Sequence, residues 1–304
     1  MENPQSLDNL YRKLYIKRTI EKLADGLVLE INTPFSKTCP DLAHISPSDF
    51  TLACMQASYM AVKQAVPDVP DNFTHAALFL GHKAEYSNQV ITDALRLTCT
   101  VKVARRGEFG LANVKLVAPG SLSKELTVGL VANMPQAAVE DISPNGQALS
   151  KYFTDEVLNI YKGERQADVV DFGYDTDANA YETSINFPQY SEIEDLGHVS
   201  AKQMIEAMMK AVLCGAANEA YSEKLPINYK EFLNNRLNFR TKGHDIKYRK
   251  FLGFGTCSLL RFRLSFNDNT CTANFENRPR AEDKEKSFAT GKMTFYLPQA
   301  GFNN

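Results

Sequence analysis

Two segments of the chain are apolar almost all the way round a helix. Residues 50–62 carry no charged side chain, and residues 204–217 carry only Glu206 and Lys210. A helix on a protein surface shows a polar stripe, so a helix that is apolar on nearly every side is expected in the interior. The pattern therefore predicts one buried helix in each half of the chain.

After each of these segments the hydrophobic period changes from that of a helix to that of a strand. Apolar and polar residues alternate along 95–103, 126–130, 260–266, 271–275 and 293–297. Such alternation is typical of antiparallel strands with one face on the core and the other in water. Each half is predicted to be a strand, a loop, a buried helix and then several long antiparallel strands.

The segments that lead into the two helices are copies of each other. Residues 31–46 and 185–200 align without a gap at an offset of 154 (185 − 31), and seven of the sixteen positions are identical. These are Ile31/Ile185, Asn32/Asn186, Pro34/Pro188, Asp41/Asp195, Leu42/Leu196, His44/His198 and Ser46/Ser200. Serine is a favoured N-cap residue, so we expect the helices to start near Pro47 and Ala201. The pattern indicates a tandem duplication.

A sheet wrapped around one central apolar helix is the hotdog architecture. Two copies in one chain predict a double hotdog of the α+β class. The pattern places the first repeat in residues 1–150 and the second in 182–304. Residues 151–181 are charged and polar, and are expected to form a connecting segment whose first part is helical.

Composition narrows the class of protein. The chain has 304 residues, 44% of them apolar, and a formal charge of −2, which gives no general attraction for nucleic acid or an anionic membrane. No apolar run reaches the roughly 20 residues of a membrane helix, and the first residues show no secretion signal. None of the six cysteines forms a CxxC pair or has a histidine at zinc spacing. We expect a cytoplasmic protein with reduced cysteines, no bound metal, and neither nucleic acid nor membrane as a partner.

The duplicated histidines, His44 and His198, lie just before the predicted helix starts. Free backbone N–H groups there can hold a thioester carbonyl and stabilise its oxyanion. Gly197 would let a ligand approach the backbone closely, whereas Ala43 in the first copy is less permissive. The alternative is that both histidines only fix the loop to the helix. The remaining histidines, His75, His82 and His244, have no counterparts in the repeat.

Carboxylates favour the second copy as the working site. Glu192 and Glu194 are present only there, and Glu206 interrupts an apolar helix where the first copy has Leu52. A carboxylate in such a place can act as a general acid or base. Two structural roles stay open: a solvated acidic loop, and a helical ion pair of Glu206 with Lys210 four residues on.

These arguments define the candidate site. The candidate catalytic residues are His198, Glu194, Glu206, His44 and Asp49. The candidate substrate-binding residues are Gly197, Ser200, Asp195, Asp41 and Ser46. Asp49 is also explained by helix capping alone.

Residues 192–200, EIEDLGHVS, resemble the segment before the central helix in hotdog thioesterases, where an acidic residue precedes Gly-His-Val-Asn. Serine replaces the asparagine here, and Glu194 matches the position of the catalytic carboxylate. A closer likeness is to the avirulence D proteins of syringolide biosynthesis, through residues 34–36 (PFS) and 44–49 (HISPSD), although their tryptophan is missing and isoleucine replaces leucine.

The avirulence D resemblance implies that a β-ketoacyl thioester is joined to a small hydroxylated partner. The A-factor synthases, also tandem hotdogs, imply similar chemistry. We expect an enzyme of specialised metabolism that condenses, hydrolyses or dehydrates an acyl thioester of coenzyme A or of an acyl carrier protein. The thioester brings its own activation, so no bound cofactor is expected. A carrier protein is a candidate partner, and a homodimer is a candidate assembly. The alternative is a non-catalytic protein that binds an acyl group or small ligand.

Overall fold

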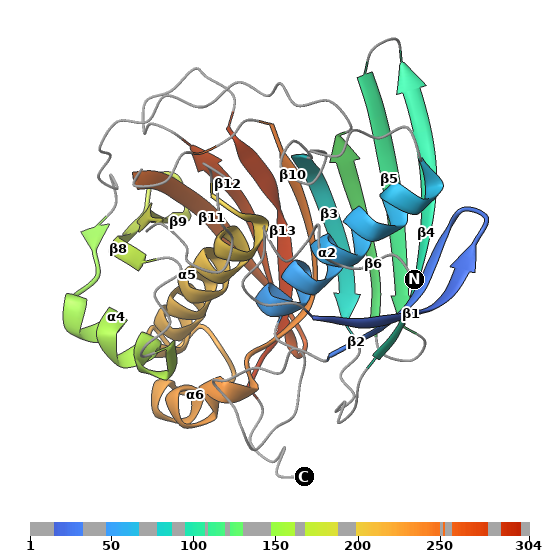
Figure 1. Cartoon of the computed structure of the whole chain (residues 1–304). Coiled ribbons are helices and arrows are strands. Elements are labelled where there is room, and N and C mark those ends of the chain that lie inside the picture. The colour runs from blue at the N-terminus through green and yellow to red at the C-terminus, as the bar shows by residue number, and fades with distance from the viewer. Residues whose placement is uncertain are drawn as a thin grey trace. The chain divides into compact units, whose positions relative to one another are not determined.

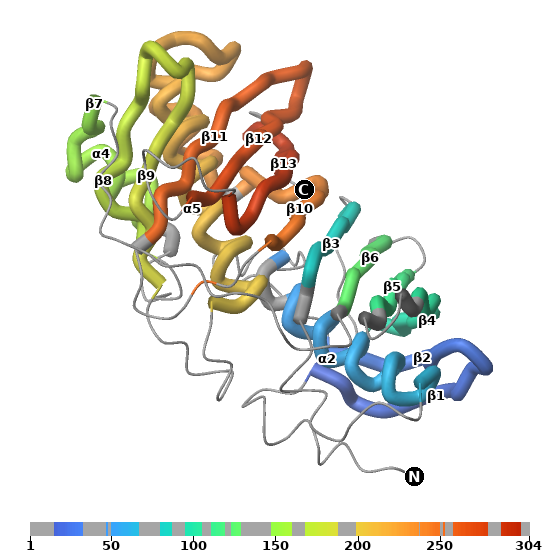
Figure 2. Tube along the Cα trace, turned by 90° about the horizontal axis from the view of Figure 1, so that it is seen from above, coloured from blue at the N-terminus to red at the C-terminus, as the bar shows by residue number. Residues whose placement is uncertain are grey.

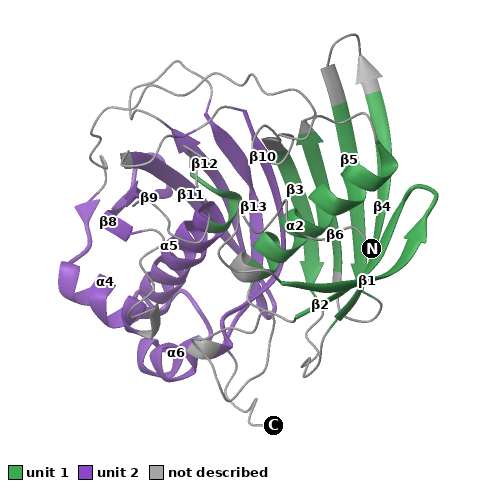
Figure 3. Cartoon of the chain, viewed as in Figure 1, with its two compact units in different colours: residues 1–135, 190–202 green, residues 136–189, 203–304 purple. Residues whose placement is uncertain are grey.

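The computed structural model describes residues 15–32, 47–66, 78–86, 95–106, 109–118, 122–129, 147–161, 168–187, 199–249, 252, 257–278 and 287–298. The chain divides into two compact units, shown in different colours in Figure 3. Unit 1 comprises residues 1–135 and 190–202, and unit 2 comprises residues 136–189 and 203–304.

Unit 1 is an antiparallel sheet with one long helix on it (Figure 1). Its elements are β1 (Ile16–Leu23), β2 (Gly26–Ile31), α2 (Pro47–Ala65), β3 (Leu78–Tyr86), β4 (Leu95–Arg106), β5 (Phe109–Ala118) and β6 (Leu122–Gly129). The strands lie in the order β1-β2-β4-β5-β6-β3. Helix α2 contacts β1, β2, β4 and β5, and Figure 2 shows it beside β1 and β2.

Unit 2 repeats this design and adds further elements. These are β7 (Gln147–Ala148), α4 (Lys151–Val157), the short 3-10 helix η1 (Leu158–Tyr161), β8 (Asp168–Asp175), β9 (Ala180–Asn186), α5 (Ala201–Tyr221), α6 (Tyr229–Asn235), the 3-10 helix η2 (Arg236–Asn238), β10 (Arg240–Tyr248), β11 (Cys257–Asn267), β12 (Thr270–Arg278) and β13 (Ala289–Tyr296). The strands lie in the order β7-β8-β9-β11-β12-β13-β10.

The two sheets have the same connectivity. When β1 to β6 are matched in turn to β8 to β13, the order β1-β2-β4-β5-β6-β3 becomes β8-β9-β11-β12-β13-β10, which is the order observed. Helices α2 and α5 take equivalent places, after the second strand of each sheet, and begin at Pro47 and Ala201 as predicted. The duplication therefore includes six strands and the central helix of each unit, and the predicted pair of helix-and-sheet repeats is confirmed.

Burial follows the periodicity of the sequence. Every residue from 50 to 59 in α2 is buried, as are residues 201–217 of α5 except Met209. Along β12 the burial alternates, with Cys271, Ala273 and Phe275 inside. The described cysteines Cys54, Cys99, Cys214 and Cys271 are free and buried, as small hydrophobic residues are. The buried helices and half-buried strands thus form the two cores.

The segment 151–181, expected as a connection, contains elements of unit 2. Its predicted helical start is confirmed as α4, whose N-cap Ser150 accepts a hydrogen bond from the backbone N–H of Phe153. Strand β8 pairs with β9, and Phe172 on β8 stacks on Tyr181 at 5.6 Å. Residues 136–150, assigned above to the first repeat, also fall in unit 2. The sequence of this segment is polar because only Phe172 and Gly173 of β8 are buried.

Candidate functional site

The structure describes only part of the predicted site. His198, Glu194, His44, Gly197, Asp195, Asp41 and Ser46 lie outside the described residues. Asp49 belongs to the first turn of α2, but its side chain is outside the description. Ser200 directly precedes α5 and is buried, and Glu206 is buried within α5. The candidate residues that can be analysed therefore lie at the start of the second central helix.

Glu206 and Lys210 form a buried ion pair on α5. The Lys210 ammonium lies 2.8 Å from Glu206 Oε1, and the side chains are only 5% and 4% exposed. Lys202 and Gln203 on the same helix are also buried. Residues spaced by four lie above one another on a helix, so Lys202, Glu206 and Lys210 form one polar stripe. The first half of α5 thus buries a row of charged groups on an otherwise apolar helix.

Such a pair is costly for the fold. The desolvation of two charges commonly exceeds their attraction, and replacing a buried pair by apolar residues is often neutral or stabilising. The equivalent positions of the first copy hold uncharged residues: Leu52 in place of Glu206 and Gln56 in place of Lys210. Both are fully buried, and Gln56 Oε1 accepts a hydrogen bond of 2.9 Å from the backbone N–H of Tyr15. The ion pair is therefore a feature of the second copy that its fold does not require.

Unit 1 carries a different buried polar group that the sequence reasoning missed. Lys124 on β6 is only 1% exposed, and its ammonium donates a 2.6 Å hydrogen bond to Thr51 Oγ1 on α2. The same nitrogen lies 5.9 Å from the centre of the Phe50 ring. Thr51 in turn donates to the carbonyl of Pro47 at 2.8 Å. The sequence did contain a sign of this burial. Alternate residues of a strand share a face, so Lys124 lies on the same core face as Leu126 and Val128.

Lys124 has two long polar neighbours on β3. It pairs in register with Ala84, so His82 and Tyr86 are its diagonal neighbours, within reach of a long side chain. His82 and Tyr86 are 2% and 8% exposed. We call Thr51, Cys54, His82, Tyr86 and Lys124 the Lys124 cluster.

Burial perturbs the titration of these groups. Burial lowers the pKa of Lys124 from 10.5 to about 8, and the Cys54 thiol opposes part of that shift. Burial, with a contribution from the Lys124 charge, holds the pKa of His82 well below its ordinary value. Burial raises the pKa of Cys54 to about 12. At neutral pH the cluster therefore combines a weakly basic amine with a neutral imidazole and a neutral thiol.

The third strand of each sheet carries the same motif, Gly-His-x-x-x-Tyr. Gly81, His82 and Tyr86 on β3 match Gly243, His244 and Tyr248 on β10. The register shifts just before the glycine in both, between Phe79 and Gly81 and between Thr241 and Gly243. The expectation that His82 and His244 have no counterparts is therefore wrong.

The offset between the copies explains why this match was missed. It is 154 at the helices (201 − 47) but 162 at the third strands (240 − 78). Eight more residues lie between the start of the helix and the start of the third strand in unit 2, where α5 is two residues longer than α2 and α6 and η2 follow it. A comparison at one fixed offset therefore loses register after the helices. Lys124 itself is not duplicated, because its counterpart is Gly291, where an added Cβ would meet the Asp245 carbonyl at 2.2 Å.

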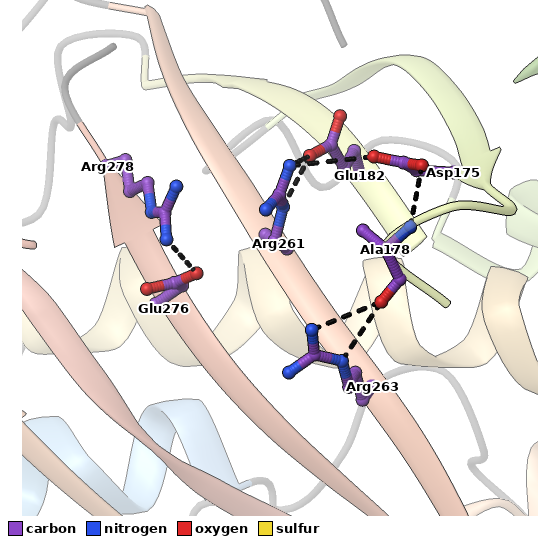
Figure 4. Close-up of polar contacts among 7 residues, drawn as sticks. All are labelled: Asp175, Ala178, Glu182, Arg261, Arg263, Glu276 and Arg278. Carbon is purple, nitrogen blue, oxygen red and sulfur yellow. Dashed lines mark hydrogen bonds and ion pairs between the residues drawn. The ribbon is translucent and has the colours of Figure 1, made fainter. Parts of the chain in front are cut away.

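A third polar group lies along β11 (Figure 4). Arg261 contacts Glu182 on β9 and Asp175 at the end of β8. Arg263 donates to the carbonyl of Ala178 at 3.1 Å, in the turn between β8 and β9. These contacts fix the β8–β9 turn to its neighbouring strand, which is a structural role.

A pH-dependent stability difference is expected for Lys124→Met. Below about pH 8 the buried ammonium is charged and its desolvation penalty is complete. Between the folded pKa of about 8 and the unfolded value of 10.5, the folded protein has lost this proton and the unfolded chain retains it, so stability rises with pH. We expect Lys124→Met to be the more stable protein near neutral pH, with its advantage shrinking by about 3 kcal/mol across this range.

Urea unfolding of both proteins at several pH values measures this difference. Cys54, His82 and Tyr86 are present in both proteins, so their own titrations largely cancel in the comparison. A constant difference across the range would show that folding does not lower the pKa of the Lys124 amine.

Comparisons with known proteins define the fold. The chain is similar to the tesB protein of Mycobacterium avium subspecies paratuberculosis, at 11% identity and a TM-score of 0.50, covering 97% of this chain and 99% of that one. It is similar to the GphF dehydratase at 12% identity and a TM-score of 0.50, covering 93% and 98%. An acyl-CoA thioesterase II, TesB2, from Mycobacterium marinum matches at 10% identity and a TM-score of 0.48, covering 93% and 97%. No protein-family model and no curated protein matches the sequence.

The fold and these similarities establish the class of protein. The chain is a tandem hotdog protein, an α+β double hotdog. No helix in the described part of the chain is long and apolar enough to cross a membrane. The same residues contain no group of three or more His, Cys, Asp or Glu side chains placed to bind a metal ion.

Proposed function

We propose that this double hotdog is an enzyme that transfers protons on an acyl thioester, in hydrolysis or dehydration, with Glu206 as the general base. The observation that carries the proposal is the buried Glu206–Lys210 pair on the second central helix. A buried ion pair lowers the stability of the fold relative to apolar residues, and a role of its charges in a reaction would explain why this chain has one. The tesB protein and the GphF dehydratase, which share the fold, support the choice of an acyl thioester as substrate.

The position of Glu206 suits this role. It lies five residues after the first residue of α5, which is about 8 Å along the helix axis. A thioester carbonyl held by backbone N–H groups of the first turn would place its acyl carbons within reach of the carboxylate. The ammonium of Lys210 favours the ionised carboxylate, which is the form that accepts a proton. His198, outside the described residues, is proposed to polarise the carbonyl from the loop before the helix.

Each reaction uses the carboxylate in a defined way. In dehydration Glu206 would take the α-proton of a β-hydroxyacyl group and return it to the β-hydroxyl oxygen, which leaves as water while the carbon–carbon double bond forms. In hydrolysis Glu206 would take a proton from the attacking water, and the thiol would leave. The thioester is proposed to be that of coenzyme A or an acyl carrier protein, which needs no resident cofactor. The resemblance to the avirulence D proteins adds a finer proposal, condensation of a β-ketoacyl thioester with a small hydroxylated acceptor in specialised metabolism.

Replacing Glu206 by glutamine should remove most of the activity. The amide keeps the shape of the side chain but cannot accept the proton, so kcat/KM should fall at least about 100-fold, the usual scale for a general base. The assay uses a panel of acyl-CoA thioesters, with thiol release reporting hydrolysis and enoyl absorbance reporting dehydration. Thiol release that requires a hydroxylated acceptor would report condensation.

Glu219→Gln is the matched control. Glu219 lies on the same helix, is also buried, and has a lysine partner, Lys224, at 3.3 Å. It lies in the last turn, far along the helix from the proposed carbonyl site, so its variant should retain activity within a few-fold. Equal losses in the two variants would attribute the effect to helix stability. No thioester activity in the wild-type chain would favour a non-catalytic binding protein.

A further inference from the structure

Lys124 is a buried cation that has no acidic partner in the part of the chain that the structure describes. Among the described residues, no carboxylate forms an ion pair with its ammonium, which donates to the neutral hydroxyl of Thr51. Its cross-strand neighbours are Ala84 on β3 and Leu116 on β5, both apolar and buried. Lysine is almost never fully buried unless it is paired, because an unpaired charge loses its hydration. This arrangement favours the neutral amine, which is the nucleophilic form.

The Lys124 cluster lies at one end of the first hotdog. Lys124 is close to the start of β6, Tyr86 is the last residue of β3, and Thr51 is in the first turns of α2. Element ends open locally at a lower free energy than the middle of a sheet, so a small molecule can reach such an amine without global unfolding.

We propose that Lys124 is a reactive amine that condenses with the carbonyl carbon of a small aldehyde or ketone to form an imine. The neutral amine attacks the carbonyl carbon, and the carbon–oxygen double bond opens to a carbinolamine. Loss of the oxygen as water then leaves a carbon–nitrogen double bond. Both hydrogens of the water come from the amine, so no oxidant, reductant or cofactor takes part. The proposal concerns unit 1 and does not depend on the role proposed for Glu206.

The neighbours of the amine supply what this step needs. Thr51 Oγ1 lies 2.6 Å from the amine and fixes its position. Dehydration of a carbinolamine needs a group that moves a proton to the departing oxygen. The buried Tyr86 hydroxyl and the His82 imidazole belong to the diagonal neighbours of Lys124 on β3, and we propose them as the groups that make that transfer. Neither carries a charge at neutral pH that would repel the ammonium.

The main alternative is a structural lysine that only joins β6 to α2. A structural role would be filled as well by methionine, which has a similar volume and no charge to desolvate. It would also leave the amine no more reactive than a surface lysine. Reactivity therefore separates the two roles.

Reductive alkylation of the full chain tests the proposal. The protein is treated with a limiting amount of propanal and cyanoborohydride, which reduces an imine to a stable propyl-lysine, and the modified residues are mapped by peptide mass spectrometry. An amine of pKa about 8 is about 300-fold more deprotonated at neutral pH than one at 10.5. Even with slower access, Lys124 should be modified at least about tenfold faster than the exposed Lys83 on β3.

Variants and pH give the controls. Lys124→Met should abolish the fast modification, whereas Lys83→Arg should leave it unchanged. The rate at Lys124 should rise with pH to a plateau above about pH 8, while rates at surface lysines go on rising toward 10.5. Modification of Lys124 at or below the rate of Lys83 in the folded wild-type chain would overturn the proposal. The wild-type mapping decides this even if Lys124→Met does not fold.

Discussion

Replacing Met208 by aspartate is expected to prevent the chain from folding. Met208 lies in the middle of α5 and is completely buried. Aspartate there would put a carboxylate where it has neither water nor a partner, which costs several kcal/mol even if it becomes protonated. Whole domains are stabilised by only about 5–15 kcal/mol, so a loss of this size removes most of the stability.

The position of Met208 on the helix makes rescue by a neighbouring charge impossible. Residues two apart on a helix do not face each other, so Lys210 and Glu206 point away from position 208. Met208→Leu is the matched control, since a swap of similar volume usually costs less than about 1.5 kcal/mol. Expression of soluble protein, followed by thermal melting, measures the effect. A soluble Met208→Asp variant that melts cooperatively would show that this face of α5 is not in the core.

The second large effect is expected at the buried ion pair. Lys210→Gln removes the ammonium and leaves the Glu206 carboxylate buried without it. Removing one partner of a buried pair typically costs about 3–5 kcal/mol, because the remaining charge keeps its desolvation penalty. Urea unfolding of the variant at neutral pH measures this loss of free energy.

The double substitution Glu206→Leu with Lys210→Gln should recover most of this stability. It gives the second helix the residues of the first, Leu52 and Gln56, which are fully buried there. We expect the double variant to lie within about 1 kcal/mol of the wild type or above it, because no buried charge remains. It should nevertheless be inactive if Glu206 is the general base. Two single variants whose losses simply add in the double would show that the groups do not interact.

Sequence reasoning predicted the fold from local patterns. The starts of α2 and α5 follow from Ser46, Ser200 and the apolar runs after them, and the alternation along β4, β11, β12 and β13 identified strands. These elements can be predicted because apolar residues recur along the sequence with the period of a helix or of a strand. Two strands were harder: β1 has no buried residue and β8 has only two, so they lack the alternation that marks a half-buried strand.

The candidate site was predicted less completely. Glu206 was found because a charge in an apolar helix stands out in the sequence, and the structure confirms its pair with Lys210. Most of the other candidates, including His198 and His44, lie outside the described residues and remain predictions. Lys124 was missed because a lysine on a strand is usually solvated, and only its phase with Leu126 placed it inside.

The sequence by itself indicated that this chain is a duplicated helix-and-sheet protein, and it left a pair of Glu206 with Lys210 as one of two interpretations. Periodicity and the ungapped repeat can be seen in the linear sequence without knowledge of the three-dimensional structure. Only the tertiary structure decided that His82 and His244 are equivalent and that Lys124 meets Thr51 in the first core. Both facts depend on strand pairing between residues far apart in the chain, where the inserted α6 and η2 change the offset. The pattern of one strand shows which of its residues face the core, but the residue that each one meets depends on the partner strand and on the turns between them.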